Sequence, residues 1–236
     1  MKRFYSQLIQ NNLLFLEKEE AQHCIKVLRC KEGDTVEVLN GNGILYAGII
    51  TAINRQEVHI SISGIKKEQF ENSNKLSIGI APTKNPARLE WFIEKATEIG
   101  IAHIFPILTE RTEKQTIKLE RLQQISISAA KQSGQLFFPV VHALTPLKEA
   151  FSDFEALQFS NHYIAHCEEE RNLLKDVYKK NEAALLLIGP EGDFTKNEIQ
   201  TALNKNYIPV SLGNSILRVE TAGMMACAII KVINDN

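Results

Sequence analysis

From residue 76 to the end of the chain, short apolar runs alternate with longer amphipathic segments, and this alternation constrains the fold more than any other feature. The apolar runs predict strands at 76–81, 101–108, 163–167, 184–188 and 208–212. The segments between and after them predict helices at 86–99, 117–133, 169–179, 196–204 and 219–233. Strands that alternate with helices in this way are typical of a mostly parallel α/β sheet.

Two of these predicted strands end in turns that contain glycine. Residues 184–188 lead into Gly189-Pro190-Glu191-Gly192, and residues 208–212 lead into Gly213. Ligands of α/β sheets bind outside the carboxyl ends of the strands, and glycine lets backbone amides approach a ligand with no Cβ in the way. The two turns therefore predict a ligand site, although many turns of this kind carry glycine for chain geometry alone. Thr195-Lys196-Asn197-Glu198 has the spacing of a capping box, so a helix should begin just after the first turn.

The first part of the chain is predicted to be mostly β-structure. Asn40-Gly41-Asn42-Gly43 is a strong hairpin signal, because Asn and Gly tolerate positive φ. The polar, aperiodic stretch 66–75 is the predicted linker, so the expected domains are residues 1–72 and 73–236. One helix is expected at 17–28, and a small closed or half-closed barrel fits the predicted strands at 4–8, 13–16, 35–39, 44–53 and 57–65.

The composition narrows the class of protein. With 236 residues, 44% of them hydrophobic and 23% charged, the chain is expected to be an ordinary globular protein. No apolar run approaches the length of a membrane span, and the first residues lack a signal-peptide pattern, so we expect a cytoplasmic protein with no membrane partner. The four cysteines and six histidines show no zinc-binding spacing, so no metal site is predicted. A net charge of −1 gives no sign of a nucleic-acid partner.

The residues of the two glycine turns carry a more specific signal. The stretches IGPEGDF at 188–194 and LGNSILRVETA at 212–222 together resemble the RsmE family of small-subunit ribosomal RNA uridine-N3 methyltransferases. The resemblance extends to residues 95–100, 132–134 and 23–34, and so covers nearly the whole chain. It implies a SPOUT-type α/β methyltransferase domain with a C-terminal trefoil knot, preceded by a PUA-like β-barrel domain that binds RNA.

The resemblance also implies an activity and its partners. The expected reaction is S-adenosylmethionine-dependent methylation of N3 of a uridine in 16S ribosomal RNA, in or near the small ribosomal subunit. Two other functions stay open: a SPOUT enzyme that methylates a ribose 2′-hydroxyl or another base, and a non-catalytic RNA-binding protein of ribosome assembly. The match over the whole chain argues against the first, and the two intact turn motifs argue against the second.

The cofactor residues that the resemblance implies lie on three loops that follow predicted strands. The glycines would permit close backbone approach, and the leucines and isoleucine would supply apolar walls. Plain core packing is the alternative, above all for Leu187. The predicted S-adenosylmethionine-binding residues are Ala165, His166, Leu187, Gly189, Pro190, Glu191, Gly192, Leu212, Gly213, Ile216, Leu217 and Thr221.

Arg218 and Glu220, which follow the last cofactor loop, are the predicted catalytic pair. The N3–H of uracil is weakly acidic, so nitrogen becomes a nucleophile only if the proton leaves or the anion is stabilised. Arg218 would stabilise negative charge on the uracil carbonyls, and Glu220 would take the proton. Alternatively, the two side chains form a structural ion pair at a helix N-terminus, where Glu is favourable on its own account.

Basic and polar side chains in several segments are the candidates for contact with RNA. A stretch at 111–135 is locally basic, which fits either a phosphate-facing strip or, as we prefer on sequence alone, a solvated helix face. The predicted RNA-binding residues are Arg29, Lys84, Arg88, Lys95, Arg111, Gln132 and Ser133. The sequence departs from the family pattern at Asp193, where Gly is usual, and at Ser215 and Gln135, where Arg is common.

The predicted last helix, 219–233, is apolar on nearly all sides. A helix of this kind must be covered on every face, so we expect a partner subunit to bury it and the protein to form a homodimer. Ala222, Gly223 and Ala226 would allow the partner to approach closely. Burial within the same chain is the alternative.

Overall fold

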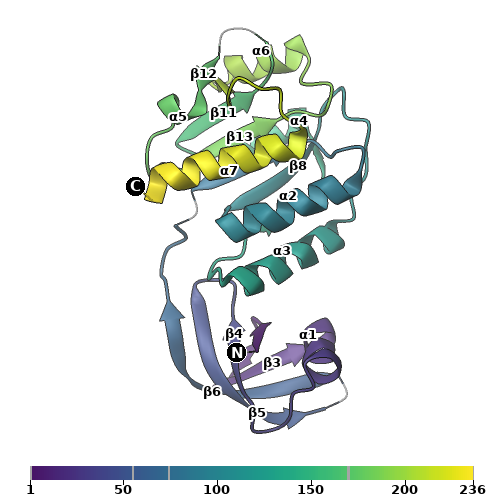
Figure 1. Cartoon of the computed structure of the whole chain (residues 1–236), viewed down its shortest axis with the longest axis vertical. Coiled ribbons are helices and arrows are strands. Elements are labelled where there is room, and N and C mark those ends of the chain that lie inside the picture. Colours follow the sequence, from purple (N-terminus) through teal and green to yellow (C-terminus); the bar gives the residue numbers. More distant parts are fainter. Residues whose placement is uncertain (1, 55, 74, 169–170, 236) are drawn as a thin grey trace. The chain divides into compact units, whose positions relative to one another are not determined.

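The computed structural model describes residues 2–54, 56–73, 75–168 and 171–235. Figure 1 shows the chain, which divides into two compact units. The first unit is Met1–Ser73 together with Ile127–Phe138, and the second is Asn74–Ser126 together with Pro139–Asn236. The sequence predicted two consecutive segments, so the grouping of residues 127–138 with the first unit was not foreseen.

The first unit contains a six-stranded sheet with the order β1-β4-β5-β6-β3-β2. One helical segment packs with it, in which α1 (Lys18–Gln22) continues into the π-helical turn η1 (His23–Val27). Fully buried side chains from sheet and helix, among them Phe4, Leu16 and Cys24, form one core. The predicted helix and strands are therefore present, but the strand predicted at 4–8 ends at Tyr5 and β2 was not predicted. The strands are β1 (Arg3–Tyr5), β2 (Ile9–Gln10), β3 (Leu13–Glu17), β4 (Thr35–Leu39), β5 (Ile44–Ile53) and β6 (Glu57–Glu68).

The hairpin between β4 and β5 forms where the sequence predicted it. The side-chain Oδ1 of Asn40 accepts the backbone N–H groups of Asn42 at 2.8 Å and Ile44 at 2.9 Å, which closes the turn. The predicted linker begins too early, however. β6 continues to Glu68, because the start of β5 pairs with residues that are polar but extended: Ile44 lies opposite Glu68.

The segment 127–138 joins the first unit through backbone hydrogen bonds to the same hairpin. Gly43 N–H donates to the carbonyl of Leu136 at 2.9 Å, and Phe138 N–H donates to the carbonyl of Gly41 at 3.0 Å. Lys131 forms an ion pair with Glu20 of α1. These contacts join residues far apart in sequence, which explains why a linear reading of the chain missed them.

The second unit is built on a parallel sheet with the order β10-β8-β7-β13-β11-β14-β12, and β9 pairs with β8 as well. Every pairing in this sheet is parallel, as predicted. The strands are β7 (Leu76–Ile80), β8 (His103–Leu108), β9 (Val140–Val141), β10 (Thr145–Pro146), β11 (Asn161–Ala165), β12 (Asn172–Leu173), β13 (Ala184–Ile188) and β14 (Ile208–Ser211).

Helices cover both faces of this sheet. α2 (Pro86–Ile99) and α7 (Val219–Asp235) lie side by side on one face, where α7 is the yellow helix of Figure 1. α4 (Leu147–Ala156) and α6 (Lys196–Asn204) pack on the other face. Along β13, Leu186 belongs to the core under α2 and α7, whereas Leu187 belongs to the core under α4 and α6. Alternation along buried strands therefore builds two separate cores.

Two expectations for the second unit were wrong. The predicted helix 169–179 is replaced by the edge strand β12, which pairs with β14, and by α5 (Leu174–Val177), which is four residues long. α4 was not predicted at all, although its apolar side is buried. α3 (Leu119–Ser133) starts two residues later than predicted. Among the described residues, no helix is both long and apolar enough to cross a membrane.

We expected a partner subunit to bury α7, but one face of this helix is already buried within its own chain. Gly223 and Ala226 are buried within their own chain, and a Cβ on Gly223 would lie 2.7 Å from Cδ2 of Phe92 in α2. The small residues therefore serve close packing of α2 against α7. Met225, 39% exposed, and Val232, 60% exposed, form an apolar stripe on the opposite side of the helix.

Candidate functional site

A cavity of about 510 Å³ opens at the carboxyl ends of β11, β13 and β14. The three strands are in register there, because Ala165 pairs with both Ile188 and Val210. Ala222 of α7 contributes to the wall. The cavity is lined by Ala165, His166, Cys167, Arg171, Ile188, Gly189, Pro190, Glu191, Asp193, Val210, Ser211, Leu212, Gly213, Asn214, Ser215, Ile216, Leu217, Arg218, Val219 and Ala222.

Nine of the twelve predicted cofactor residues line this cavity, and three do not. The side chain of Leu187 is fully buried in the core under α4 and α6. Gly192 presents its carbonyl to Arg111, and Thr221 is exposed on the first turn of α7. Leu187 was assigned to the wrong face because its neighbours in sequence do not reveal which side of a fully buried strand faces the site.

The glycines of the two turns have different structural roles. A Cβ on Gly189 would lie 3.1 Å from the backbone nitrogen and the ring of Phe194, so the turn itself leaves little room for a side chain there. Gly213 has a φ of +142°, and a Cβ there would meet no atom within 4 Å. Room for a ligand is therefore consistent with Gly213, whereas at Gly189 the turn itself also favours glycine.

His166 closes one wall of the cavity at the end of β11. Its side chain is 7% exposed, and neither Nδ1 nor Nε2 has a hydrogen-bond partner among the described residues. Burial lowers the pKa of this imidazole below 6.5, although Asp193 opposes the shift. A neutral imidazole has one donor and one acceptor, so His166 can offer both to a bound molecule. Buried polar groups without partners are rare, so His166 makes this wall a candidate ligand site.

Glu220 lies beside the cavity on the first turn of α7. It is 9% exposed, and its Oε2 has no hydrogen-bond partner among the described residues. Its Oε1 lies 3.6 Å from Nε of Arg88 on α2. The structural ion pair considered for Glu220 thus involves Arg88 and not Arg218. Arg218 lines the cavity and is exposed, and its side chain makes no ion pair within the described part of the chain.

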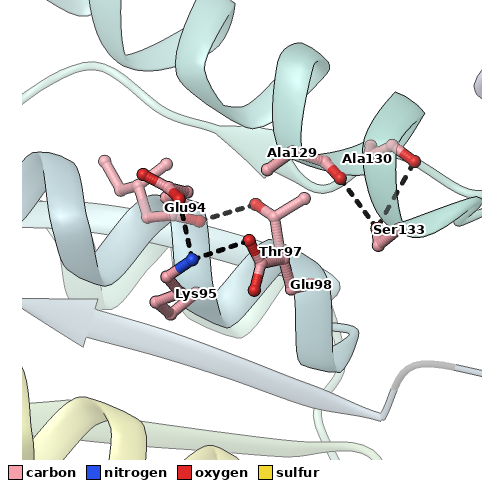
Figure 2. A network of polar contacts seen from close by, with 8 residues as sticks. Glu94, Lys95, Thr97, Glu98, Ala129, Ala130 and Ser133 are labelled. Carbon is pink, nitrogen blue, oxygen red and sulfur yellow. Dashed lines mark hydrogen bonds and ion pairs between the residues drawn. The ribbon is translucent and has the colours of Figure 1, made fainter.

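Two predicted RNA-binding lysines of the second unit are engaged by carboxylates. Lys84 Nζ lies 2.7 Å from Glu113 Oε1, and both side chains are largely exposed. Lys95 Nζ lies 2.8 Å from Glu94 Oε1 and 2.9 Å from Glu98 Oε1, as Figure 2 shows. Exposed ion pairs of this kind are weak, so a phosphate can compete with them. Contact with RNA stays a prediction for both lysines.

Arg111 and the remaining predicted RNA-binding residues lie in other surroundings. Arg111 Nη1 donates to the carbonyl of Gly192 at 2.7 Å and to that of Phe194 at 3.3 Å, and so braces the first glycine turn. Arg29, Gln132 and Ser133 belong to the first unit and are exposed there. Ser133 Oγ donates to the carbonyl of Ala129 within its own helix (Figure 2).

Several residues of the site were missed by the sequence reasoning. Arg171 lines the cavity, and its Nη1 donates to the carbonyl of His166 at 2.6 Å. It was overlooked because it lies in the segment predicted to be helical. Cys167 and Asp193 also line the cavity, and only the unusual Asp in a glycine turn gave a signal in the sequence. Among the residues that the structure describes, no group of three or more His, Cys, Asp or Glu side chains is placed to hold a metal ion.

Both units match known protein families. A family model described as an RNA methyltransferase domain matches residues 70–231, and one described as an RNA methyltransferase PUA domain matches residues 16–63. A ribosomal RNA small subunit methyltransferase E from Synechocystis sp. is 34% identical over 221 residues, which cover 89% of this chain and 70% of the relative.

Solved structures agree with these matches. A probable rRNA-methyltransferase from Porphyromonas gingivalis is 36% identical, with a TM-score of 0.87 over 100% of this chain and 99% of that one. A ribosomal RNA small subunit methyltransferase E from Neisseria gonorrhoeae, bound to S-adenosyl methionine, is 26% identical, with a TM-score of 0.86 over 99% and 98% of the two chains. The resemblance predicted from the two turn motifs is therefore confirmed: the chain belongs to the ribosomal RNA small subunit methyltransferase E family.

Proposed function

We propose that this protein methylates N3 of a uridine in 16S ribosomal RNA and takes the methyl group from S-adenosylmethionine. Membership of the family supports methylation of small-subunit ribosomal RNA. The observation that carries the proposal is the cavity at the carboxyl ends of β11, β13 and β14, with the unpartnered ring nitrogens of His166 in its wall. The N3 position of uridine as the target rests on the likeness of the turn motifs.

The residues of the cavity fit the chemistry of this cofactor. S-adenosylmethionine supplies a methyl group made electrophilic by the sulfonium to which it is attached. Its carboxylate, ammonium and sulfonium groups need charges of both signs, and the cavity offers Arg171 and Arg218 as well as Glu191. Gly213, at the open side, leaves space beside its backbone, and neutral His166 can pair with polar edges of the ligand.

Glu220 and Arg218 are assigned the two roles that a uracil substrate requires. A carboxylate oxygen without a partner can accept the N3 proton, and Oε2 of Glu220 is such an atom. Arg218 is exposed at the cavity and has no partner among the described residues, so its guanidinium is available to the O2 or O4 carbonyl of uracil as negative charge develops. Arg88, with Nε 3.6 Å from Oε1, would hold the Glu220 side chain in place.

The proposed assembly is a homodimer with a trefoil knot in each subunit. The apolar stripe of Met225 and Val232 on α7 supports the dimer, because a partner would remove this surface from water. The knot would place the loop 212–217 through the preceding chain, and its support is the likeness to SPOUT enzymes. Sedimentation should give a dimer for the wild type and a monomer for Val232→Lys. A wild-type monomer at micromolar concentration would contradict this assembly.

The first unit is the proposed RNA-binding domain, and the second unit carries the methyltransferase activity. The match of residues 16–63 to a PUA domain supports this division. Arg29 is exposed in the first unit, where it can reach a phosphate. Because the substrate is ribosomal RNA, we place the reaction in the cytoplasm.

Calorimetry with S-adenosylmethionine tests the cofactor, and Gly213→Val tests the cavity. The substitution places a branched side chain in the open space of the loop and should abolish binding. Gly33→Val is the matched control, because Gly33 also has a positive φ, +89°, and open space around it, but lies outside the cavity. Absence of binding by the wild type would overturn the proposed function. Mass mapping of ribosomal RNA from cells that lack the protein would identify the methylated nucleotide.

A further inference from the structure

Asp193 lies in the first glycine turn in a backbone conformation that side chains rarely adopt. Its φ is +61°, and its backbone N–H donates to the carbonyl of Pro190 at 3.0 Å, which closes the turn. Glycine meets this conformational requirement at no cost, and Asp meets it less well. Asp adds to the turn a carboxylate whose bonds glycine could not make.

Both carboxylate oxygens of Asp193 accept backbone hydrogen bonds. Oδ1 accepts the N–H of Phe194 at 2.7 Å, next to the start of α6. Oδ2 accepts the N–H of Cys167 at 2.8 Å, which belongs to the loop after β11 and lies 26 residues away in sequence. The same loop carries His166, with its two unpartnered ring nitrogens. One side chain thus joins two of the three loops that line the cavity.

We propose that Asp193 is a positioning residue that fixes the His166–Cys167 backbone against the glycine turn and so sets the affinity for the cofactor. The inference rests on the proposed function, because the ligand is S-adenosylmethionine. Without the bond to Cys167, the β11 loop is competent for binding only part of the time. Apparent affinity then falls by the fraction of competent molecules, while the chemical step is unchanged once the ligand is bound.

Cys167 provides a reporter of this contact that needs no cofactor. It is the exposed cysteine of the chain, since Cys24, Cys30 and Cys227 are buried. Burial and the neighbouring Asp193 carboxylate raise the pKa of the Cys167 thiol. Removing the carboxylate should lower this pKa and expose the loop, so the thiolate fraction and the rate of alkylation at pH 8 should both rise.

The test compares Asp193→Gly, Asp193→Asn and Asp193→Ala with the wild type. Glycine retains the turn and loses both bonds, asparagine keeps one acceptor oxygen, and alanine adds backbone strain. We expect Asp193→Gly to raise the Kd and the KM for S-adenosylmethionine about 10-fold while kcat changes less than about threefold. Asp193→Asn should lie between glycine and the wild type. Asn206→Gly is the matched control, because Asn206 has a φ of +63° and lies outside the cavity.

Iodoacetamide alkylation of Cys167, located by mass spectrometry, is measured on the same proteins. The rate should rise at least about threefold in Asp193→Gly and remain at the wild-type value in Asn206→Gly. Wild-type affinity and wild-type alkylation in Asp193→Gly would overturn the role of Asp193. If the wild type itself bound no S-adenosylmethionine, the proposed function would fail, whereas the alkylation rates would still decide whether Asp193 holds the loop.

Discussion

Glu220→Gln is the substitution that best separates catalysis from stability in this protein. The change keeps the volume of the side chain and removes a carboxylate that is 9% exposed and has one unpartnered oxygen. The ion pair with Arg88 is long, at 3.6 Å, and the Arg88 side chain is 36% exposed, so the pair is worth at most about 1 kcal/mol. Glutamine buries no charge at this position, which removes the desolvation cost of the carboxylate and offsets the lost ion pair. The free energy of unfolding should therefore stay the same or rise slightly.

The catalytic rate of Glu220→Gln should fall, although its stability should not. A positioned general base accelerates proton transfer by about 10²–10⁴-fold, which corresponds to about 3–5 kcal/mol of activation free energy. We expect kcat to fall by this factor in Glu220→Gln, while the Kd for S-adenosylmethionine stays within about threefold of the wild type, since Glu220 does not line the cavity. Single-turnover transfer of a labelled methyl group to small-subunit RNA measures kcat, and urea unfolding measures stability.

Glu198 is the matched control, because it is also a buried glutamate in the first turn of a helix. It is 8% exposed, and its carboxylate is fully used: Oε2 accepts the N–H of Thr195 at 2.8 Å and Oε1 accepts the N–H of Glu110 at 2.8 Å. Glu198→Gln replaces one acceptor by a donor, which should lower the free energy of unfolding by about 1–3 kcal/mol and leave kcat per folded molecule unchanged. The reasoning is refuted if Glu220→Gln retains wild-type kcat, or if it destabilises the protein as much as Glu198→Gln.

Two further predictions concern packing and pH. Gly223→Ala should lower the free energy of unfolding by about 1–3 kcal/mol in urea titrations, because the new Cβ meets the fully buried ring of Phe92; unchanged or greater stability would contradict this. His142 stacks on Phe105 with ring centroids 4.0 Å apart. Burial, and to a lesser extent the neighbouring His103, lowers the pKa of His142 from 6.5 to about 4. The unfolded chain therefore binds more protons between pH 6.5 and 4, so stability falls as the pH falls through this range, by up to about 3 kcal/mol. His142→Asn should flatten this dependence in urea unfolding at pH 7 and pH 5, and an unaltered slope would show that other groups cause it.

Elements with strong local signals could be predicted from the sequence. The bounds of α2, Pro86–Ile99, agree with the prediction because Asn85 caps the helix start through a bond to Ala87 N–H at 3.0 Å and Gly100 ends it at a φ of +104°. α6 begins where the capping box of Thr195 and Glu198 placed it. These signals act within four residues, so the sequence contains all of the information that they need.

Most of the residues that line the site could also be predicted from local motifs, but the contacts among their side chains could not. The two turn motifs located the cavity, since the carboxyl ends of parallel strands meet at one edge of a sheet. They did not reveal that Leu187 faces the opposite core, or that Glu220 pairs with Arg88 on another helix. Which face of a fully buried strand meets the ligand depends on the helices that cover it.

The sequence alone thus determined the five central strands of the second unit, its α/β class, the β-rich first unit and the location of the cavity, because hydrophobic period and turn chemistry are local properties. Tertiary structure alone decided that Asn172–Leu173 form an edge strand beside β14, that 127–138 pack on the hairpin of the first unit, and that Asp193 bonds to Cys167. Each of these contacts uses a backbone group from a segment distant in sequence. The contact can therefore stabilise the structure only after the fold has brought the two segments together.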